Sequence, residues 1–477
     1  MVAAQQPVPP QQPAAGGRRL DGRRRYEGLT REHGFESMRI EGALPPELRG
    51  TLYRNGPSLT SLFGVDYTHP FEADGGISAV RFADGRAEGA LRLIESAGLR
   101  EERAAGRMLY GLRLPWRHRI LNALRGRRKN AANTSVLRWQ ERLFALFEVD
   151  LATEFDPEDL STIGAHDFGG VVPSAMSAHP HAVASLNTQF HFGARFSRES
   201  FIDLFELPAR GPARRLASVP LRAPVMLHDF IATPRHLVFF VSPARVRVLR
   251  ALLQLGHLEQ LFAWRPELGT EIIVVPLDDL EHPRRFTVDP FFQFHFANAF
   301  ERGDGTIAVD YVRYADLEIL HALGEHTELE AEARLHRAIV DPARESLESR
   351  PLLGDFCEFP RIDPRRAGER WRYTWLFAPG PPQSIIRLDV EDGTEDRWAL
   401  PASRWASEPV VVPRPGSTRE GDAHVLTLIY DAETHTSGVS VLDAMKLADG
   451  PVATAWFDHH IPSTYHGVWV PAQGRVG

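Results

Sequence analysis

The stretch "FFQFHFANAFERGDGTIAVDYV" (Phe291–Val312) shows the pattern on which the fold of this chain depends. Two apolar runs of strand length flank "ERGDGT", whose glycines and aspartate are typical of a tight turn. Because successive side chains of a strand point to opposite faces, Phe292, Phe294 and Phe296 are predicted to share one face and His295 to occupy the other. The stretch therefore predicts a β-hairpin that carries a single imidazole among small residues.

The same rhythm repeats along most of the chain. From about residue 36 onward, short apolar or alternating runs are separated by turn clusters such as "RNGPS", "EADGG", "FADGR", "APGPP" and "VEDGT". Many short strands at regular spacing favour a propeller or a large barrel over a sandwich. Since the sequence shows no WD or kelch period, repeats do not give the number of blades. The pattern predicts an all-β fold.

Composition narrows the class of protein. The chain has 477 residues, of which 43% are hydrophobic and 25% charged, as in ordinary globular proteins. A net charge of −7 argues against general nucleic-acid binding. The single cysteine, Cys357, excludes an internal disulfide and favours a reducing compartment. Since no segment approaches ~20 uninterrupted apolar residues, we expect no membrane-spanning helix and a cytoplasmic location.

Residues 1–24 are rich in Pro, Gln, Ala and Arg and are predicted to form a flexible tail. Residues 25–477 are predicted to form one catalytic domain. Within it, Leu114–Asn130 and Ser242–Trp264 look helical, with Ser242 as an N-cap of the second helix. These helices either pack on the β core or, because they mix Trp, Leu and Arg, contact a membrane surface peripherally.

The membrane interpretation depends mainly on the first of these segments. Its apolar residues are Leu114, Trp116, Ile120, Leu121 and Leu124, and its basic residues are Arg117, Arg119, Arg125, Arg127, Arg128 and Lys129. Apolar insertion combined with basic contacts to anionic lipid is the pattern of an interfacial helix.

Four of the twenty histidines have similar surroundings: His179, His228, His295 and His466 each have an apolar flank and a small or turn-forming residue nearby. Each one alone is a core histidine, a general base or a metal ligand, and no local feature decides. Four such residues in an all-β chain make a shared metal a testable hypothesis. Their spacing over nearly 300 residues is not a local metal signature.

Six short motifs in order carry a resemblance to a known family. They are "AHP" at 178–180, "MLHDF" at 226–230, "FHFAN" at 294–298, "EFPRID" at 358–363, "EPVVVPRPG" at 408–416 and "YHGVWV" at 465–470. Over most of residues 36–472 the chain resembles the carotenoid cleavage oxygenases. The resemblance implies a seven-bladed β-propeller with helical insertions over one face, in which the four histidines hold one Fe(2+) on the axis.

The resemblance also implies three carboxylates that receive the second N–H of the histidines. Glu148, Glu358 and Glu408 would pair with His228, His295 and His466 in that order, which fixes the orientation of each ring. The alternative is that these glutamates are surface residues at strand ends. No fourth glutamate matches His179.

Residues near these motifs are predicted to contact the substrate. Thr134 matches a family threonine whose methyl group limits access to a vacant iron position, and Phe147 replaces the lysine typical of members that cleave phenolic stilbenes. An apolar side chain there favours an isoprenoid substrate. Aromatic residues suited to line a polyene tunnel, or else simply core residues, are Phe71, Phe147, Phe294 and Tyr465.

The implied function is oxidative cleavage by O₂ of a C=C bond in a carotenoid or apocarotenoid, giving two carbonyl products. Three alternatives stay open: a dioxygenase that cleaves stilbenoids, a non-oxidative isomerase, and a non-catalytic binding propeller. The partners would be an apolar polyene or a stilbenoid, O₂ and a membrane surface, and no nucleic acid is expected. His181 is interpreted as a decoy, as are His459 and His460 in "FDHHIP", which are assigned to a solvated loop.

Overall fold

The computed structural model describes residues 22–196, 199–253, 255–325 and 333–472. The predicted tail therefore lies outside the described residues, except for 22–24. These three residues begin a 3-10 helix, η1 (Gly22–Tyr26), whose first glycine packs against Trp405.

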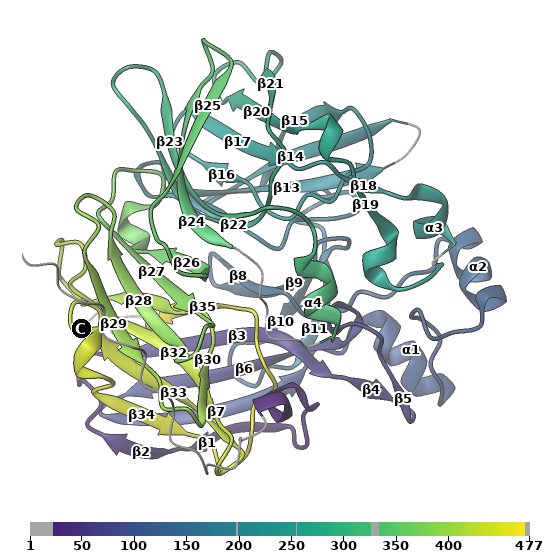
Figure 1. Ribbon diagram of the computed structural model, residues 1–477. Helices are drawn as coiled ribbons and strands as arrows, with labels where there is room; N and C mark the ends of the chain where they lie inside the picture. The colour runs from purple at the N-terminus through teal and green to yellow at the C-terminus, as the bar shows by residue number, and fades with distance from the viewer. Residues whose placement is uncertain (1–21, 197–198, 254, 326–332, 473–477) are drawn as a thin grey trace, which may run out of the picture.

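The strands form seven sheets of four or more strands arranged around one axis, a seven-bladed β-propeller (Figure 1). This confirms the fold class. Blade 1 contains β1 (His33–Ser37), β7 (Arg86–Leu93), β6 (Asp74–Ala83), β3 (Gly50–Leu59) and β35 (His466–Pro471), in that spatial order. Blade 2 contains β11 (Thr162–His166), β10 (Ala152–Phe155), β9 (Arg142–Leu146) and β8 (Ser135–Trp139). Blade 3 contains β15 (Arg214–Leu221), β14 (Ser200–Pro208), β13 (Thr188–Phe196) and β12 (His181–Val183).

The next blades repeat this order from the outside inward. Blade 4 contains β21 (Arg284–Val288), β20 (Thr270–Pro276), β17 (His236–Val241) and β16 (Ile231–Ala232). Blade 5 contains β25 (Ser346–Pro351), β24 (Arg334–Asp341), β23 (Ile307–Tyr314) and β22 (Phe292–Glu301), and blade 6 contains β29 (Glu395–Ala399), β28 (Ser384–Asp389), β27 (Tyr373–Ala378) and β26 (Glu358–Ile362). Blade 7 contains β2 (Arg39–Gly42), β34 (Ala453–Trp456), β33 (Thr436–Asp443) and β32 (Ala423–Asp431), with β30 (Arg404–Ala406) and β31 (Val410–Pro413) both paired to β32.

The core is divided among the interfaces between blades. Each of seven clusters of buried apolar side chains lies between two neighbouring blades, as Leu52 of blade 1 and Leu426 of blade 7 illustrate. The alternating strands thus bury both faces of each sheet. The inner strands β8, β12, β16, β22, β26, β31 and β35 surround the axis and carry the motifs of the sequence.

The ring closes by pairing the ends of the chain. The last strand, β35, completes blade 1 by pairing antiparallel with β3, while the early strand β2 pairs with β34 of blade 7. Closure removes free sheet edges at this point.

Among the described residues, four helices and two short hairpins interrupt the blades. The helices are α1 (Ala97–Ala105), α2 (Trp116–Leu124), α3 (Val248–Leu252) and α4 (Ile319–Glu325), and α1, α2 and α3 gather on one side of the molecule (Figure 1). The hairpins pair β4 (Ser61–Leu62) with β5 (Val65–Asp66) and β18 (Ala244–Val246) with β19 (Phe262–Trp264). The other 3-10 turns are η2 (Pro70–Glu72), η3 (Ala184–Leu186), η4 (Leu258–Leu261), η5 (Pro266–Leu268), η6 (Pro364–Arg366) and η7 (Leu447–Asp449).

The prediction of one helix over Ser242–Trp264 is wrong. The segment begins and ends as β18 and β19, which pair with each other, and only α3 and η4 between them are helical. Ser242 is buried beside β18 rather than capping a helix. The first helical segment is confirmed in part, because α2 covers only Trp116–Leu124. Among the described residues, no helix is long and apolar enough to cross a membrane.

The predicted face of Phe296 is also wrong. β22 and β23 shift register between Gln293 and Phe296, as in a β-bulge. As a result, Phe292 and Phe294 pack between blades 5 and 6, whereas Phe296 packs between blades 4 and 5. Bulges redirect side chains beside functional sites, and this one lies at His295.

Candidate metal centre

The four histidines of the motifs meet on the propeller axis. His466 begins β35, His295 lies in β22, and His179 and His228 lie just before β12 and β16. The ring centroids of His179 are 4.3 Å from His228, 5.0 Å from His295 and 4.7 Å from His466, and those of His295 and His466 are 4.9 Å apart. All four side chains are buried. The inner strands of four blades therefore bring together residues that are far apart in the sequence.

Carboxylates face the Nδ1 atoms of three of these rings. His295 Nδ1 is 2.5 Å from Glu358 Oε2, and His466 Nδ1 is 2.8 Å from Glu408 Oε1. The Nδ1 atom of His228 contacts Glu148 Oε1. These three Glu–His pairs are the ones that the family resemblance implies. Because an ionised carboxylate can only accept a hydrogen bond, each Nδ1 carries the proton.

The Nε2 atoms are then free to act as ligands. Those of His228 and His295 face each other at 3.3 Å, and the buried Nε2 of His179 has no hydrogen-bond partner among the described residues. One nitrogen from each of these three histidines lies within 4.8 Å of the others. Bare nitrogens that converge in a buried space fit a metal cation, because nothing else there satisfies their lone pairs.

At His179 and His466, electrostatics favours the neutral imidazole, the form that binds metals. Burial lowers the pKa of His179 well below its usual value, and the neighbouring histidines lower it further. Burial also lowers the pKa of His466 to about 4, although Glu408 opposes this shift. For His295, burial lowers the pKa but the carboxylate of Glu358 raises it more.

The carboxylates have partners of their own, which the sequence did not reveal. Tyr314 donates its hydroxyl to Glu358 Oε1 at 2.5 Å. Glu408 accepts from Arg361 at 2.9 Å and from the backbone N–H of Gly467 at 2.8 Å, and Arg54 lies 3.7 Å away. Glu148 is a quarter exposed, in contrast to the buried Glu408. The motif "EFPRID" contained Arg361, but Tyr314 lies outside every motif.

Asp229 connects three of the inner strands. Its carboxylate accepts from the backbone N–H of Phe230 at 2.8 Å and of Phe296 at 2.9 Å, and lies 2.7 Å from His181 Nε2. Phe296 directly follows His295, and His181 begins β12 just after His179. Asp229 stands beside His228 in "MLHDF" but was not predicted to belong to the site, and His181 was interpreted as a decoy.

The predicted substrate residues lie around this cluster. Phe294 packs edge-on against His228 with centroids 4.8 Å apart, and Phe71 packs edge-on against Tyr465 at 5.7 Å. Tyr465 is partly buried, and this burial raises the pKa of its hydroxyl. Phe147 is half-buried next to Glu148.

Two further residues border the site. Thr134 is buried just before β8, and its hydroxyl donates to Asn133 Oδ1 at 3.2 Å. Phe359, which the sequence analysis missed, has its ring centroid 5.3 Å from both His295 and His466. Its φ of 53° is left-handed, and such strained backbone often occurs at functional sites.

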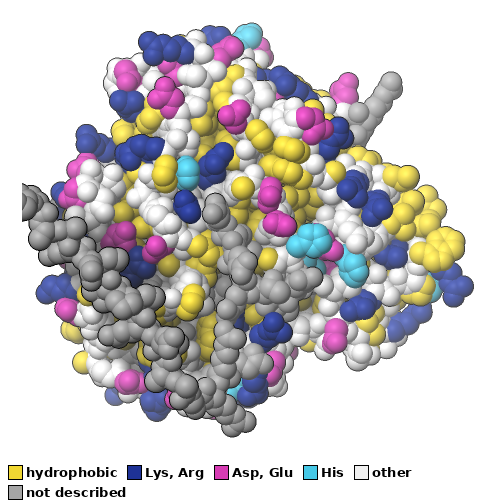
Figure 2. Space-filling view, viewed as in Figure 1, with side chains coloured by type: hydrophobic (Ala, Val, Ile, Leu, Met, Phe, Trp, Pro, Cys, Tyr) yellow, Lys and Arg dark blue, Asp and Glu magenta, His cyan; other side chains and the backbone are white. Residues whose placement is uncertain are grey.

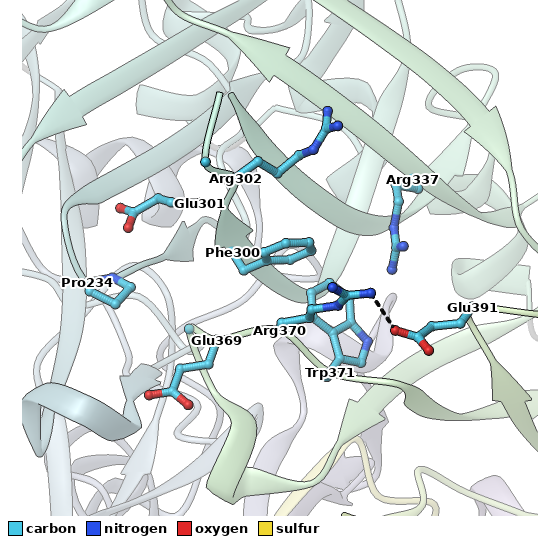
Figure 3. Close-up of a pocket in the computed structure, with 11 residues that line it drawn as sticks. Pro234, Phe300, Glu301, Arg302, Arg337, Glu369, Arg370, Trp371 and Glu391 are labelled. Atoms are coloured by element: carbon cyan, nitrogen blue, oxygen red, sulfur yellow. Dashed lines mark hydrogen bonds and ion pairs between the residues drawn. The ribbon is translucent and has the colours of Figure 1, made fainter. Parts of the chain in front are cut away.

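A cleft of about 690 Å³ lies away from the histidines, between blades 4, 5 and 6 (Figure 3). Phe300 and Trp371 form its apolar part, with Arg337 and Arg370 beside them (Figure 3). Arg337 binds Asp310 at 2.7 Å and Arg370 binds Glu391 at 2.7 Å, so the protein itself neutralises both cations. None of the predicted site residues lines this cleft.

Comparison with known proteins gives one consistent group. The family model for the retinal pigment epithelial membrane protein matches residues 27–471. The apocarotenoid-15,15'-oxygenase of Synechocystis sp. is 32% identical, covering 94% of this chain and 95% of its own. Lignostilbene-alpha,beta-dioxygenase isozyme III of Sphingomonas paucimobilis is 27% identical over 91% and 94%, and isoeugenol monooxygenase of Pseudomonas nitroreducens is 26% identical over 91% and 94%.

Solved structures agree with this grouping. Cobalt-substituted Synechocystis apocarotenoid oxygenase superposes with a TM-score of 0.86 at 31% identity, covering 94% of this chain and 98% of that one. A Glu-to-Gln mutant of the same enzyme gives a TM-score of 0.87 at 32% identity over the same shares.

Proposed function

Because the chain belongs to the retinal pigment epithelial membrane protein family, within the carotenoid cleavage oxygenase superfamily, we propose that it is an Fe(II)-dependent dioxygenase. It cleaves a C=C bond of an apocarotenoid or carotenoid with O₂ and releases two carbonyl products. The observation that carries the proposal is the convergence of His179, His228 and His295, with their Nε2 atoms bare, at one buried point.

The four axial histidines would hold the iron. Neutral imidazoles suit Fe(II), and a set without a carboxylate leaves the dication's charge uncompensated. When bound, the iron supplies the redox chemistry that activates O₂. Glu148, Glu358 and Glu408 hold the imidazole rings in the tautomer and orientation that this requires.

The remaining residues bind and orient the substrate and exclude water. Phe294, Phe359 and the Phe71–Tyr465 pair place aromatic surface around the histidines, as an apolar polyene needs. The proposed reaction places the two atoms of O₂ on the two carbons of the broken bond. No proton enters or leaves, so the site needs no acid or base, and holding the double bond in position is the main task of the protein.

Phe147 favours a polyene over a stilbenoid. It precedes Glu148 and offers no hydrogen bond to a phenol oxygen. The Synechocystis relative, named for an apocarotenoid, is also more similar in sequence than the lignostilbene relative.

The exposed apolar surface on α2 and α3 supports delivery of the substrate from a bilayer at a cytoplasmic membrane face. Exposed side chains are Trp116, Leu121 and Leu124 of α2 and Val248, Leu249 and Leu252 of α3. We call these six residues the apolar rim; Figure 2 shows hydrophobic side chains gathered where α2 and α3 lie in Figure 1. Lys129 is not available to lipid, because it is buried against Asp74 and Glu102 at 2.6 Å each.

The test is anaerobic loading with Fe(II), followed by oxygen uptake and product masses with β-carotene, apocarotenals and hydroxystilbenes. We expect O₂ consumption and two carbonyl fragments with an apocarotenal, and neither in His466→Ala. Turnover of a hydroxystilbene alone would make the chain a stilbenoid-cleaving enzyme. Full turnover by His466→Ala would refute the assignment of the metal ligands.

A further inference from the structure

A second pair of histidines lies far from the axis. His33 in β1, the outer strand of blade 1, and His459, between β34 and β35, have ring centroids 4.9 Å apart. Their Nε2 atoms face each other at 3.3 Å, although 426 positions separate them in the chain. His459 was assigned to a solvated loop, but the structure encloses its ring, which is only 14% exposed.

The other nitrogen of each ring determines its tautomer. His33 Nδ1 is 2.8 Å from the carbonyl oxygen of Gly34, and His459 Nδ1 is 2.6 Å from Asp458 Oδ1. A carbonyl and an ionised carboxylate only accept, so both Nδ1 atoms carry hydrogen. Two neutral rings then direct bare Nε2 lone pairs at each other, which is repulsive unless a proton or a metal cation lies between them.

The axial site contains the same arrangement. There, His228 and His295 also have their Nδ1 atoms against acceptors and their Nε2 atoms 3.3 Å apart. We propose that His33 and His459 form a second metal site, for a divalent ion such as Zn²⁺. Two imidazoles bound to tetrahedral zinc at 2.0–2.1 Å place their nitrogens about 3.3–3.4 Å apart. Water completes the coordination on the open side.

The surroundings favour a positive charge between the two rings. Glu36 lies 3.6 Å from His33 Nδ1, and Arg31 contacts both Glu36 and Asp458. Two carboxylates and one guanidinium leave one net negative charge beside the pair, which suits a cation.

Such a site would link blade 1 to the segment that follows blade 7, where the propeller closes. β1 forms the outer edge of blade 1, and the segment that contains His459 leads from blade 7 to β35, the strand that completes blade 1. A metal bound to both histidines links these segments directly and stabilises the folded chain by an amount that grows with the logarithm of the free metal concentration.

The experiment uses the full chain stripped of metal with EDTA and titrated calorimetrically with Zn²⁺. We expect two equivalents to bind to the wild type and one to His33→Ala or His459→Gln. His460→Ala is the matched control, because His460 is the buried neighbour in sequence, and its Nε2 bonds to the backbone oxygen of Glu27 at 3.2 Å. It should keep two equivalents. Once one equivalent of Zn²⁺ has filled the axial site, further Zn²⁺ should increase the melting temperature of the wild type but not that of His33→Ala.

A wild type that binds one equivalent, or a stoichiometry that is the same in the wild type, His33→Ala and His459→Gln, would overturn the proposal. So would ¹⁵N spectra showing a proton on Nε2 of either ring in Zn²⁺-saturated protein. Should His33→Ala fail to fold, His459→Gln decides, since glutamine retains polar contacts at that position. His179→Ala removes the axial equivalent instead, so failure of this proposal is distinguishable from failure of the proposed function.

Discussion

The three carboxylates beside the axial histidines differ in what else holds them. Glu408 is buried and binds Arg361 and the N–H of Gly467, Glu358 binds Tyr314, and Glu148 is a quarter exposed. We therefore predict that replacing any one of these glutamates by Gln impairs metal binding or turnover without abolishing it. Each change should weaken metal affinity or activity by about 10–100-fold, because a histidine loses its charged acceptor.

Stability should separate the three variants more clearly than activity does. Glu408→Gln leaves two guanidinium groups near the site without their counter-charge, which costs about 3–5 kcal/mol for a buried pair. Glu148→Gln should cost less than Glu408→Gln, because the Glu148 side chain is a quarter exposed and water screens its charge. Urea unfolding of the apo proteins measures this, and equal losses in the two variants would contradict the order.

Asp229 should position the ligands without touching the metal. Its carboxylate fixes the backbone at Phe296, beside His295, and the ring of His181, near His179. We predict that Asp229→Asn lowers Co²⁺ affinity of the apo protein by about 10-fold, the lower end of the range for outer contacts of metal ligands. The absorption of bound Co²⁺ should also change, because the coordination geometry does.

Asp203→Asn is the matched control for Asp229. Asp203 is equally buried and binds Arg195, Arg215 and Ser218 within blade 3, but none of these residues belongs to the metal centre. This variant should lose stability and keep both Co²⁺ affinity and spectrum. A spectrum of Asp229→Asn identical to that of the wild type would show that Asp229 only stabilises the fold.

At this scale the family resemblance predicted the histidines and their glutamate partners, but not the other side chains that contact them. Six local motifs contain the four histidines, Glu358 and Glu408, and the family resemblance added Glu148. Asp229, just before β16 of blade 4, accepts a hydrogen bond from Phe296 in blade 5, and Tyr314 on β23 donates to Glu358 on β26 of the next blade. Such contacts depend on the register between strands, and the shift at His295 shows that simple alternation does not give it.

Among the elements, the insertions were hardest to predict. Apolar and basic residues at helical spacing occur in both segments, but β18 and β19 pair across the second, and this pairing overrides the local preference. The regular strands had no such ambiguity, because turn residues delimit each run and each run has two buried faces.

The apolar rim provides a prediction for α2. Trp116→Ser with Leu121→Ser should weaken salt-sensitive binding to anionic liposomes, since both side chains are exposed and neither is needed by the core. Val452→Ser, which removes a similarly exposed side chain from blade 7, is the control and should bind as the wild type does. Sedimentation measures the bound fraction. Equal binding of the wild type and the double variant at low salt would exclude the rim as a membrane contact.

Glu301 joins two blades and should make stability depend on pH. At the end of β22, it accepts from Thr233 at 2.7 Å and from the backbone of Arg235 at 2.9 Å, and lies 2.9 Å from His236. Burial alone would raise the pKa of Glu301, but hydrogen bonds from His236, Thr233 and Arg235 lower it from 4.5 to about 2.

The direction of this pH dependence follows from the linkage between proton binding and folding. A carboxyl with a lowered folded-state pKa stabilises the protein above pH 4.5 and loses this contribution as the pH falls towards 2. The full shift corresponds to about 3 kcal/mol, and we expect roughly half because the side chain keeps some contact with water, which screens its charge. Urea unfolding of the wild type and Glu301→Gln at pH 7 and pH 3 measures it. The difference between them should shrink at pH 3, and a difference independent of pH would contradict the assignment.

For the whole molecule, the sequence predicted the class of architecture, and the blade number came from the family resemblance. No repeat marks the blades, because each interface between blades has its own apolar residues and the strands vary in length. Nor does local pattern show that β35 returns to β3, since that pairing joins the two ends of the chain. The same strand begins with His466, so closure of the ring also brings this histidine to the metal centre.

Arg54 connects these two events and supports the last prediction. It is 1% exposed and lies on β3, from which it donates to Thr464 Oγ1 at 2.7 Å and to the backbone oxygens of Glu408 and Tyr465 at 3.0 and 3.1 Å. Burial lowers the pKa of Arg54 to about 10 although Glu408 opposes this, so the side chain stays charged at pH 7. One guanidinium thus holds blade 1, blade 7 and the segment before His466.

We predict that Arg54→Met lowers the free energy of unfolding by about 3–5 kcal/mol, because it leaves buried acceptors and the Glu408 carboxylate without a partner. It should also lower metal affinity, since His466 follows the segment that Arg54 fixes. The matched control is Arg81→Met on the adjacent strand β6, where Arg81 pairs with the exposed Glu158, and such surface pairs contribute less than about 1 kcal/mol. Urea unfolding and Co²⁺ titration compare the two variants. Equal losses of stability, or unchanged metal affinity in Arg54→Met, would mean that the metal centre forms independently of ring closure.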